Sequence, residues 1–180
     1  MSIAVARSVR LALAGELVPD AVNVKGGPIA EAVRPGIALA ENLGRVAGSL
    51  ATASLEAVEV EVLGEVAEND VKILELAALK GVFSALVTYP VSYVNAPVLA
   101  GERGVAVSLT TTTEPATWRN TVRVHLSLTD GSQITVGGTV TGPRSVQRLV
   151  EIDGFEIDVP VSEHVAFLRY TDRPGVVGAA

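Results

Sequence analysis

The chain contains no cysteine, few aromatic residues with a single tryptophan among them, and no cluster of basic residues. Without cysteine, this chain can form no disulfide, thiolate zinc site, thiolate-ligated iron–sulfur cluster or cysteine nucleophile. Its 180 residues carry a formal net charge of −6, whereas proteins that bind nucleic acids usually present a basic face. We therefore expect small molecules or other proteins as partners, and no nucleic acid.

Long hydrophobic runs are also missing. The longest stretch without a charged residue, 81–101, contains two prolines and an asparagine, which would break a membrane-spanning helix. The first residues lack the basic segment and long apolar run of a secretory signal. The sequence therefore predicts a cytoplasmic protein that does not insert into a membrane.

Apolar residues make up 48% of the chain, mostly alanine and valine, which is enough to bury the core of one domain. Apolar periodicity predicts a first helix over 3–13, with a linker over 18–27. Further helices are predicted over 28–50, from 71 to beyond 82, and over 95–103. We expect Pro35-Gly36 to interrupt the first of these, with a longer helix from Ile37. Gly81 is expected to be tolerated inside the second at a cost of about 1 kcal/mol.

Strand patterns dominate the second half. Val58, Val60 and Val62 alternate with glutamates and predict a strand with one solvated face, and Asp130-Gly131 is typical of a hairpin turn. Further strands are predicted over 105–112, 122–128, 134–140, 146–152, 155–159 and 165–170. Helices mixed with strands, followed by a meander of strands, favour an α+β fold, an antiparallel sheet with helices packed on one face.

Residue types suited to catalysis are scarce. The two histidines, His125 and His164, lie on strand-like segments and are best interpreted as solvent-facing. No nucleophile elbow and no glycine-rich dinucleotide loop is present, so the sequence predicts no catalytic, cofactor-binding or metal-binding residue in this chain. Trp118 beside Arg119 is interpreted as a loop anchor, with a binding corner as the alternative.

Two candidate ligand sites remain. Arg144 and Arg148 flank a short strand and could hold an anion such as phosphate or carboxylate, with plain surface charge as an equal alternative. The segment 167–178 reads as a strand, a tight loop and the first turn of a helix, which would favour a carboxylate. There Asp172 could bind an ammonium group or simply cap the helix. Because a helix that has only begun cannot bury its apolar face, we expect the chain to be a piece of a longer protein.

Several short segments recur in an order that resembles D-3-phosphoglycerate dehydrogenase in its long form, which has an intervening domain before a terminal ACT domain. The resemblance covers nearly the whole chain. It rests on Val9–Val24, Leu43-Gly44, Gly64-Glu65, Leu79-Lys80-Gly81, Val94-Asn95-Ala96, Glu102-Arg103-Gly104, Gly137-Gly138-Thr139-Val140, Ile152-Asp153-Gly154 and Arg173-Pro174-Gly175.

The resemblance implies a division of the chain. Residues 1–17 would be the last helix of the catalytic half, 18–27 a hinge linker, 28–163 the intervening, allosteric substrate-binding domain, and 164–180 the truncated start of the ACT domain. The full enzyme would oxidise 3-phosphoglycerate to 3-phosphohydroxypyruvate with NAD, in L-serine biosynthesis. Its catalytic and NAD-binding domains would lie upstream, leaving a regulatory, oligomer-forming fragment here.

Site residues and partners also follow from the resemblance. Tyr170 and Asp172 match positions that contact the inhibitor L-serine, and Arg148 matches a residue of an anion site. Phe155, Glu156 and Pro160 stand where that site has basic or polar residues, and Glu156 would repel a phosphorylated ligand. The expected partners are the catalytic domains of the same chain, further copies in a homo-oligomer, and L-serine or a phosphorylated anion. The alternative is a stand-alone sensor of an amino acid or a phosphorylated anion.

Overall fold

The computed structural model describes residues 9–10, 29–162 and 164–167. Of the helix expected over 3–13, only Val9 and Arg10 are described, and both are helical. The linker expected over 18–27 lies outside the described residues.

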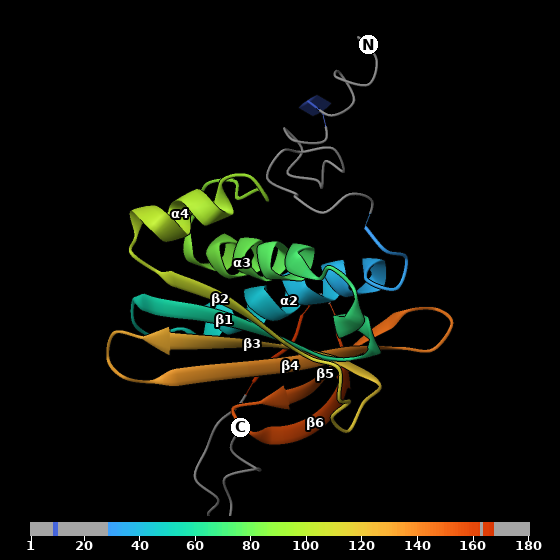
Figure 1. Ribbon diagram of the computed structural model, residues 1–180. Coiled ribbons are helices and arrows are strands. Elements are labelled where there is room, and N and C mark those ends of the chain that lie inside the picture. The colour runs from blue at the N-terminus through green and yellow to red at the C-terminus, as the bar shows by residue number, and fades with distance from the viewer. Residues whose placement is uncertain (1–8, 11–28, 163, 168–180) are drawn as a thin grey trace, which may run out of the picture.

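A six-stranded sheet carries three helices on one face (Figure 1). The fold is therefore α+β with a mostly antiparallel sheet, as the sequence predicts. In chain order the elements are α2 (Arg34–Leu50), β1 (Leu55–Gly64), the short 3-10 helix η1 (Glu65–Glu68), α3 (Lys72–Leu86), α4 (Ala96–Glu102), β2 (Ala106–Thr112), β3 (Asn120–Leu128), β4 (Gln133–Thr141), β5 (Val146–Ile152) and β6 (Phe155–Pro160).

The strand order is β2-β1-β3-β4-β5-β6. Every neighbouring pair is antiparallel except β1 and β2, which are parallel. The sequence predicts these strands but not the parallel pair. Parallel neighbours need a long crossover connection, and the segment 65–105 supplies it with α3 and α4. At the other end, the Asp130-Gly131 turn joins β3 to β4 as predicted, and Gly131 takes a positive φ of 83°.

Helix α2 begins earlier than expected. We predict a longer helix only from Ile37, after an interruption at Pro35-Gly36, yet α2 already begins at Arg34. Pro35 lies in its first turn, where a missing N–H costs no hydrogen bond and the fixed φ suits a helix. The predicted interruption is therefore wrong, because the proline comes at the start of the helix.

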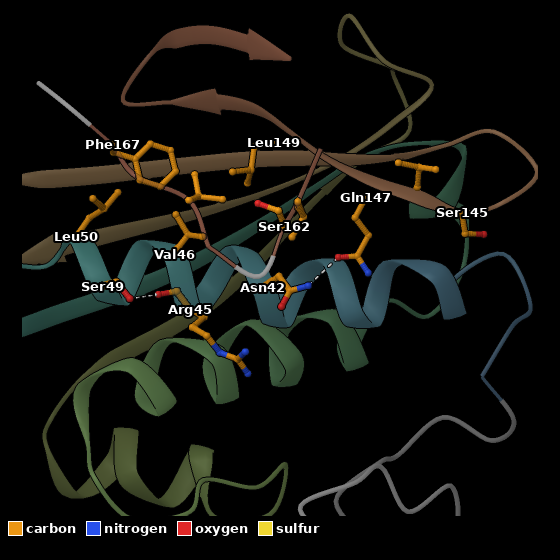
Figure 2. Close-up of a pocket in the computed structure, with 13 residues that line it drawn as sticks. Asn42, Arg45, Val46, Ser49, Leu50, Ser145, Gln147, Leu149, Ser162 and Phe167 are labelled. Carbon is orange, nitrogen blue, oxygen red and sulfur yellow. Dashed lines mark hydrogen bonds between the residues drawn. The ribbon is translucent and has the colours of Figure 1, made fainter. Parts of the chain in front are cut away.

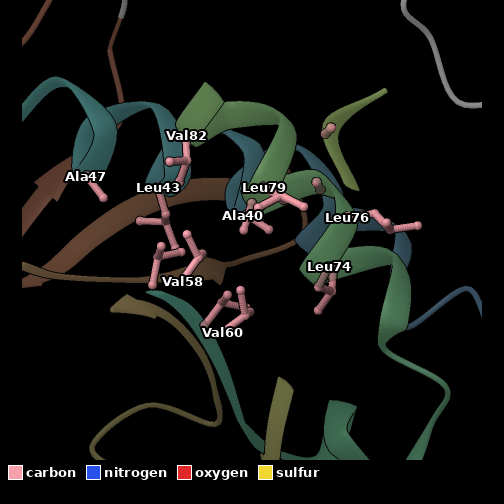
Figure 3. Close-up of a cluster of buried hydrophobic side chains, with 14 of the residues drawn as sticks. Ala40, Leu43, Ala47, Val58, Val60, Leu74, Leu76, Leu79 and Val82 are labelled. Carbon is pink, nitrogen blue, oxygen red and sulfur yellow. The ribbon is translucent and has the colours of Figure 1, made fainter. Parts of the chain in front are cut away.

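The core lies between the sheet and the pair α2–α3. Val58, Val60 and Val62 of β1 are fully buried, as their alternation predicts. Figure 3 shows side chains of α2 and α3, Leu43 and Leu79 among them, gathered above Val58 and Val60. The helix pair and the inner face of the sheet thus bury one continuous cluster.

Glycines bring α2 and α3 into backbone contact. A Cβ on Gly81 would lie 2.0 Å from the carbonyl oxygen of Glu41, and one on Gly44 would lie 2.1 Å from that of Ala78. Both distances are far below any real Cβ contact. Gly81 is therefore required by packing, and the expectation that it is merely tolerated in a helix is wrong.

A polar cluster of Glu41, Lys80 and Tyr93 lies on the outer side of the pair α2–α3. Lys80 Nζ lies 3.0 Å from Glu41 Oε2, and the buried Tyr93 donates its hydroxyl to the same oxygen at 3.2 Å. The Lys80 ammonium also lies 4.7 Å from the centre of the Tyr93 ring. Burial, followed by the charge of Glu41 and its hydrogen bond, raises the pKa of Tyr93.

Because of this cluster, we expect the folded chain to lose stability at alkaline pH. The pKa of Tyr93 is higher in the folded chain than the unfolded value of about 10. The protonated Tyr93 therefore stabilises the folded chain fully below that pH, and this stabilisation is lost progressively as the pH rises above it. The free energy of unfolding should then fall by up to about 1.4 kcal/mol per pH unit on account of this residue. Urea unfolding between about pH 9 and about pH 11 should show a shallower decline for Tyr93→Phe. Equal slopes in the two proteins would contradict the prediction.

Candidate functional site: a groove between α2 and β5

A groove of about 740 Å³ separates α2 from the start of β5. Residues 161–162 and 164–167 form its third wall. Val161 donates its N–H to the carbonyl oxygen of Gln147 at 2.9 Å, and Phe167 lines the groove with Leu50 (Figure 2). The residues 165–167 of the strand expected over 165–170 are not in a strand. One wall of the groove is therefore made by irregular chain that follows β6 and not by a strand.

The side chains of Asn42 and Ser49 in the groove already have hydrogen-bond partners. Asn42 Nδ2 donates to Gln147 Oε1 at 2.8 Å, which links α2 to β5, and Ser49 Oγ donates to the carbonyl oxygen of Arg45 at 2.8 Å. The Arg45 guanidinium extends away from the other lining residues (Figure 2) and pairs with Glu41 at 3.1 Å. Because no cation among the described lining residues faces the groove, it is better suited to packing a chain segment than to binding an anion.

The two arginines predicted as an anion site are not brought together in the groove. Arg148 forms an ion pair with Asp158 of β6, and its hydrogen bond to that carboxylate raises the pKa of Arg148. Arg144 lies exposed in the turn between β4 and β5. The anion site therefore stays a prediction, and an anion would have to compete with Asp158 for Arg148.

Removal of that competitor gives a direct test of the anion site. Asp158→Asn should raise the affinity for inorganic phosphate about fivefold, the weight of one surface ion pair, because the guanidinium loses its neighbouring carboxylate. Isothermal titration with phosphate would measure it, with Glu102→Gln on α4 as an exposed control. An unchanged affinity in Asp158→Asn would count against Arg144 and Arg148 as an anion site.

The other predicted residues have plain positions. His125 lies on the helix-free face of the sheet, 2.9 Å from Thr135 Oγ1 and 3.7 Å from Glu61 Oε2. His164 is exposed, and Arg119 forms an ion pair with Glu65, which supports the interpretation of this loop as an anchor. Tyr170 and Asp172, predicted to contact serine, lie outside the described residues.

A charged cluster on the helix-free face was not predicted. Arg123 Nη1 lies 3.0 Å from Glu61 Oε2, and its Nε lies 2.8 Å from Glu151 Oε2. Burial disfavours the charged guanidinium, but the hydrogen bonds to both carboxylates outweigh it and raise the pKa of Arg123. Gly137 lies between β3 and β5, and a Cβ there would come within 3.0 Å of Glu151 Cβ. Its missing side chain leaves room for the Arg123–Glu151 pair to cross β4.

Within residues 9–10, 29–162 and 164–167, no group of three potential metal-ligating side chains is present. None of the helices in that same part of the chain is long and apolar enough to cross a bilayer.

Comparison with known proteins identifies the family. Residues 32–153, more than half of the chain, match the model of the D-3-phosphoglycerate dehydrogenase intervening domain. The chain belongs to this family. It is 44% identical to the D-3-phosphoglycerate dehydrogenase of Mycobacterium leprae and 45% identical to that of Mycobacterium tuberculosis, over 97% of this chain in each case. The enzyme of the same name from Synechocystis is 30% identical over 99% of it.

This chain covers nearly the same share of the length of each of these relatives. The intervening-domain chain spans 33% of the two mycobacterial enzymes and 32% of the Synechocystis enzyme. It therefore corresponds to about a third of the length of the curated relatives it matches. The division at 17, 27 and 163 expected from the sequence stays a prediction.

Proposed function

We propose that this chain is a regulatory, oligomer-forming part of a D-3-phosphoglycerate dehydrogenase. The whole protein would oxidise 3-phosphoglycerate to 3-phosphohydroxypyruvate with NAD, in L-serine biosynthesis. One observation carries the proposal: relatives of that name match 97% of this chain but only a third of their own length. Catalysis and NAD binding are assigned to the remaining two thirds of such a protein.

The fold suggests how regulation would pass through this part. Helix α2 begins a few residues after the expected hinge linker, and its last residue, Leu50, lines the groove with Phe167. Asn42 in the middle of α2 is hydrogen-bonded to Gln147, whose carbonyl oxygen accepts the N–H of Val161. A ligand that moves the segment after Phe167 would thereby shift α2 and the catalytic domains before it. Tyr170 and Asp172 are the proposed serine contacts.

The size and activity of the native protein test this proposal. An antibody raised against the chain should detect, in the source cells, a polypeptide about three times its length, since the relatives have that proportion. The purified polypeptide should reduce NAD when given 3-phosphoglycerate, and the 180-residue chain alone should not. A native band at the mass of 180 residues would contradict the proposal and favour the stand-alone sensor.

The signal path through α2 needs its own experiment in the full-length protein. Gln147→Ala removes the side-chain bond to Asn42 and leaves the backbone bond to Val161 in place. Inhibition by L-serine should weaken while the uninhibited rate stays unchanged. Serine inhibition equal to that of the unaltered protein would count against α2 as the connection.

A further inference from the structure

The two edges of the sheet differ in how they are protected against pairing. β6, at one edge, carries the carboxylates of Glu156 and Asp158 and ends at Pro160. Charges and prolines on an edge strand discourage another strand from pairing with it. β2, at the other edge, has neither, because the stretch 105–113 contains no charged residue and no proline. The β2 edge is therefore open to a further strand.

This open edge is also exposed. Within the described part of the chain β2 pairs with β1 alone, and five of its seven residues are exposed. An edge strand leaves a row of backbone N–H and C=O groups without strand partners. Val107 is 36% exposed although it lies in a strand, and Leu109 is half-buried. The edge therefore offers both backbone hydrogen bonds and apolar side chains to a partner.

The register with β1 shows which way the side chains of β2 face. Val107, Leu109 and Thr111 lie beside the three buried valines of β1, so they face the side that carries the helices. The residues between them face the helix-free side, where Thr110 donates its hydroxyl to Glu59 Oε1 at 2.9 Å. Each side of β2 thus presents uncharged side chains only.

We propose that β2 pairs antiparallel with β2 of a second copy of the chain, around a twofold axis at Leu109. Two six-stranded sheets then join into one, and the interface is the same patch on both copies. This inference rests on the oligomer-forming role proposed above and specifies the surface that carries it. The pairs across the axis are Leu109 with its own copy, Val107 with Thr111, Ser108 with Thr110, and Ala106 with Thr112.

The charges favour a second copy as the occupant of this edge. Each copy has a net charge of −6, so self-association is least opposed where the surface has no charge. No pair in this register sets like charges opposite each other, and pairs of hydroxyl and of β-branched side chains are favourable neighbours. The same arrangement of β6 around Ile157 would set Glu156 against Asp158, which is unfavourable. A strongly charged partner strand would find no opposite charge on β2.

Charge substitutions at the ends of β2 test the register. The 180-residue chain, which has its own continuous core, should be a dimer of twice 18.6 kDa in size-exclusion chromatography with light scattering. Ala106→Lys with Thr112→Lys sets lysines opposite each other in two pairs and should raise the dissociation constant about tenfold or more. The β1 neighbours of these positions, Ala57 and Leu63, are uncharged, so the fold is not affected by new charge contacts.

Mixing two variants gives the decisive measurement. The chain with Ala106→Glu and Thr112→Glu should also dissociate alone, yet an equimolar mixture with the lysine variant should dimerise again, because each lysine then faces a glutamate. Val159→Lys on β6, at a site that is 42% exposed, should leave the dimer unchanged. Far-UV circular dichroism checks that all variants are folded.

Three results would overturn the pairing: a monomeric unaltered chain at every concentration measured, a lysine variant that dimerises as tightly as the unaltered chain, or a mixture that stays monomeric. A dimer that the lysine variant leaves intact would assign the contact to another face, without contradicting the oligomer-forming role. Failure of the proposed function is recognised separately, by a native polypeptide of only 180 residues.

Discussion

Gly81→Ala should unfold the chain or destabilise it by about 3 kcal/mol or more, at the upper end of overpacking costs. The added methyl group would lie 2.0 Å from the carbonyl oxygen of Glu41 and 2.9 Å from the backbone nitrogen of Arg45. Both are backbone atoms of α2, so neither can rotate away and the helices must separate. The higher helix propensity of alanine offsets only about 1 kcal/mol of this cost. Urea unfolding followed by circular dichroism would measure the difference.

Gly101→Ala is the matched control. Gly101 also lies in a helix, α4, but a Cβ there meets nothing within 4 Å. The same substitution should therefore be neutral or stabilise the chain by up to about 1 kcal/mol. If both variants unfolded at the same urea concentration, the close approach of α2 and α3 would be refuted.

Leu43→Ala should destabilise the chain by about 3 kcal/mol, within the range for buried leucines. Leu43 is fully buried, and its Cδ2 lies 2.8 Å from the position that a Cβ on Gly138 would occupy. The leucine thus fills the space that the glycine of β4 leaves open, and its truncation creates a cavity between α2 and the sheet. Thermal or urea unfolding of the folded variant would give the value.

A double variant separates this contact from general loss of apolar surface. Gly138→Ala alone should destabilise the chain by overpacking against Leu43, Leu39 and the carbonyl oxygen of Arg148. It should cost less once Leu43 is alanine, because one of these three contacts is then relieved. Additive costs for the two substitutions would contradict the contact. Val98→Ala, at a site that is 56% exposed, should change the free energy of unfolding by no more than about 0.5 kcal/mol.

Much of the architecture could be predicted because local patterns determine it. The alternation around Val60 identifies β1 and its buried face, and Asp130-Gly131 identifies the β3–β4 turn. The parallel pairing of β1 with β2 could not be predicted, because alternation identifies a strand but not its neighbour. The required glycines at 44 and 81 were missed for the same reason, since the clash lies in another helix.

The candidate sites, too, could be predicted only where the local sequence determines them. Arg148 was identified from its charge and spacing, yet its partner Asp158 becomes evident only once β5 and β6 are paired. The charged cluster around Arg123 on the helix-free face collects residues from three strands, and its position depends on the register of β1, β3, β4 and β5. Gly137 is the one feature of the sequence that could have indicated it, because a glycine inside a strand often marks a close approach of neighbours.

The crossover between β1 and β2 bears on the order in which the chain folds. β3 to β6 are joined by short turns, so their contacts are local and close at little entropic cost. β2 reaches β1 only after 65–105 has been arranged as helices, and such non-local pairings slow folding. We expect the hairpins to collapse onto β1 and α2 first and the edge strand β2 to join last. During synthesis α2 and α3 would leave the ribosome before β3, so their apolar faces would stay exposed until β3 and the strands after it had followed.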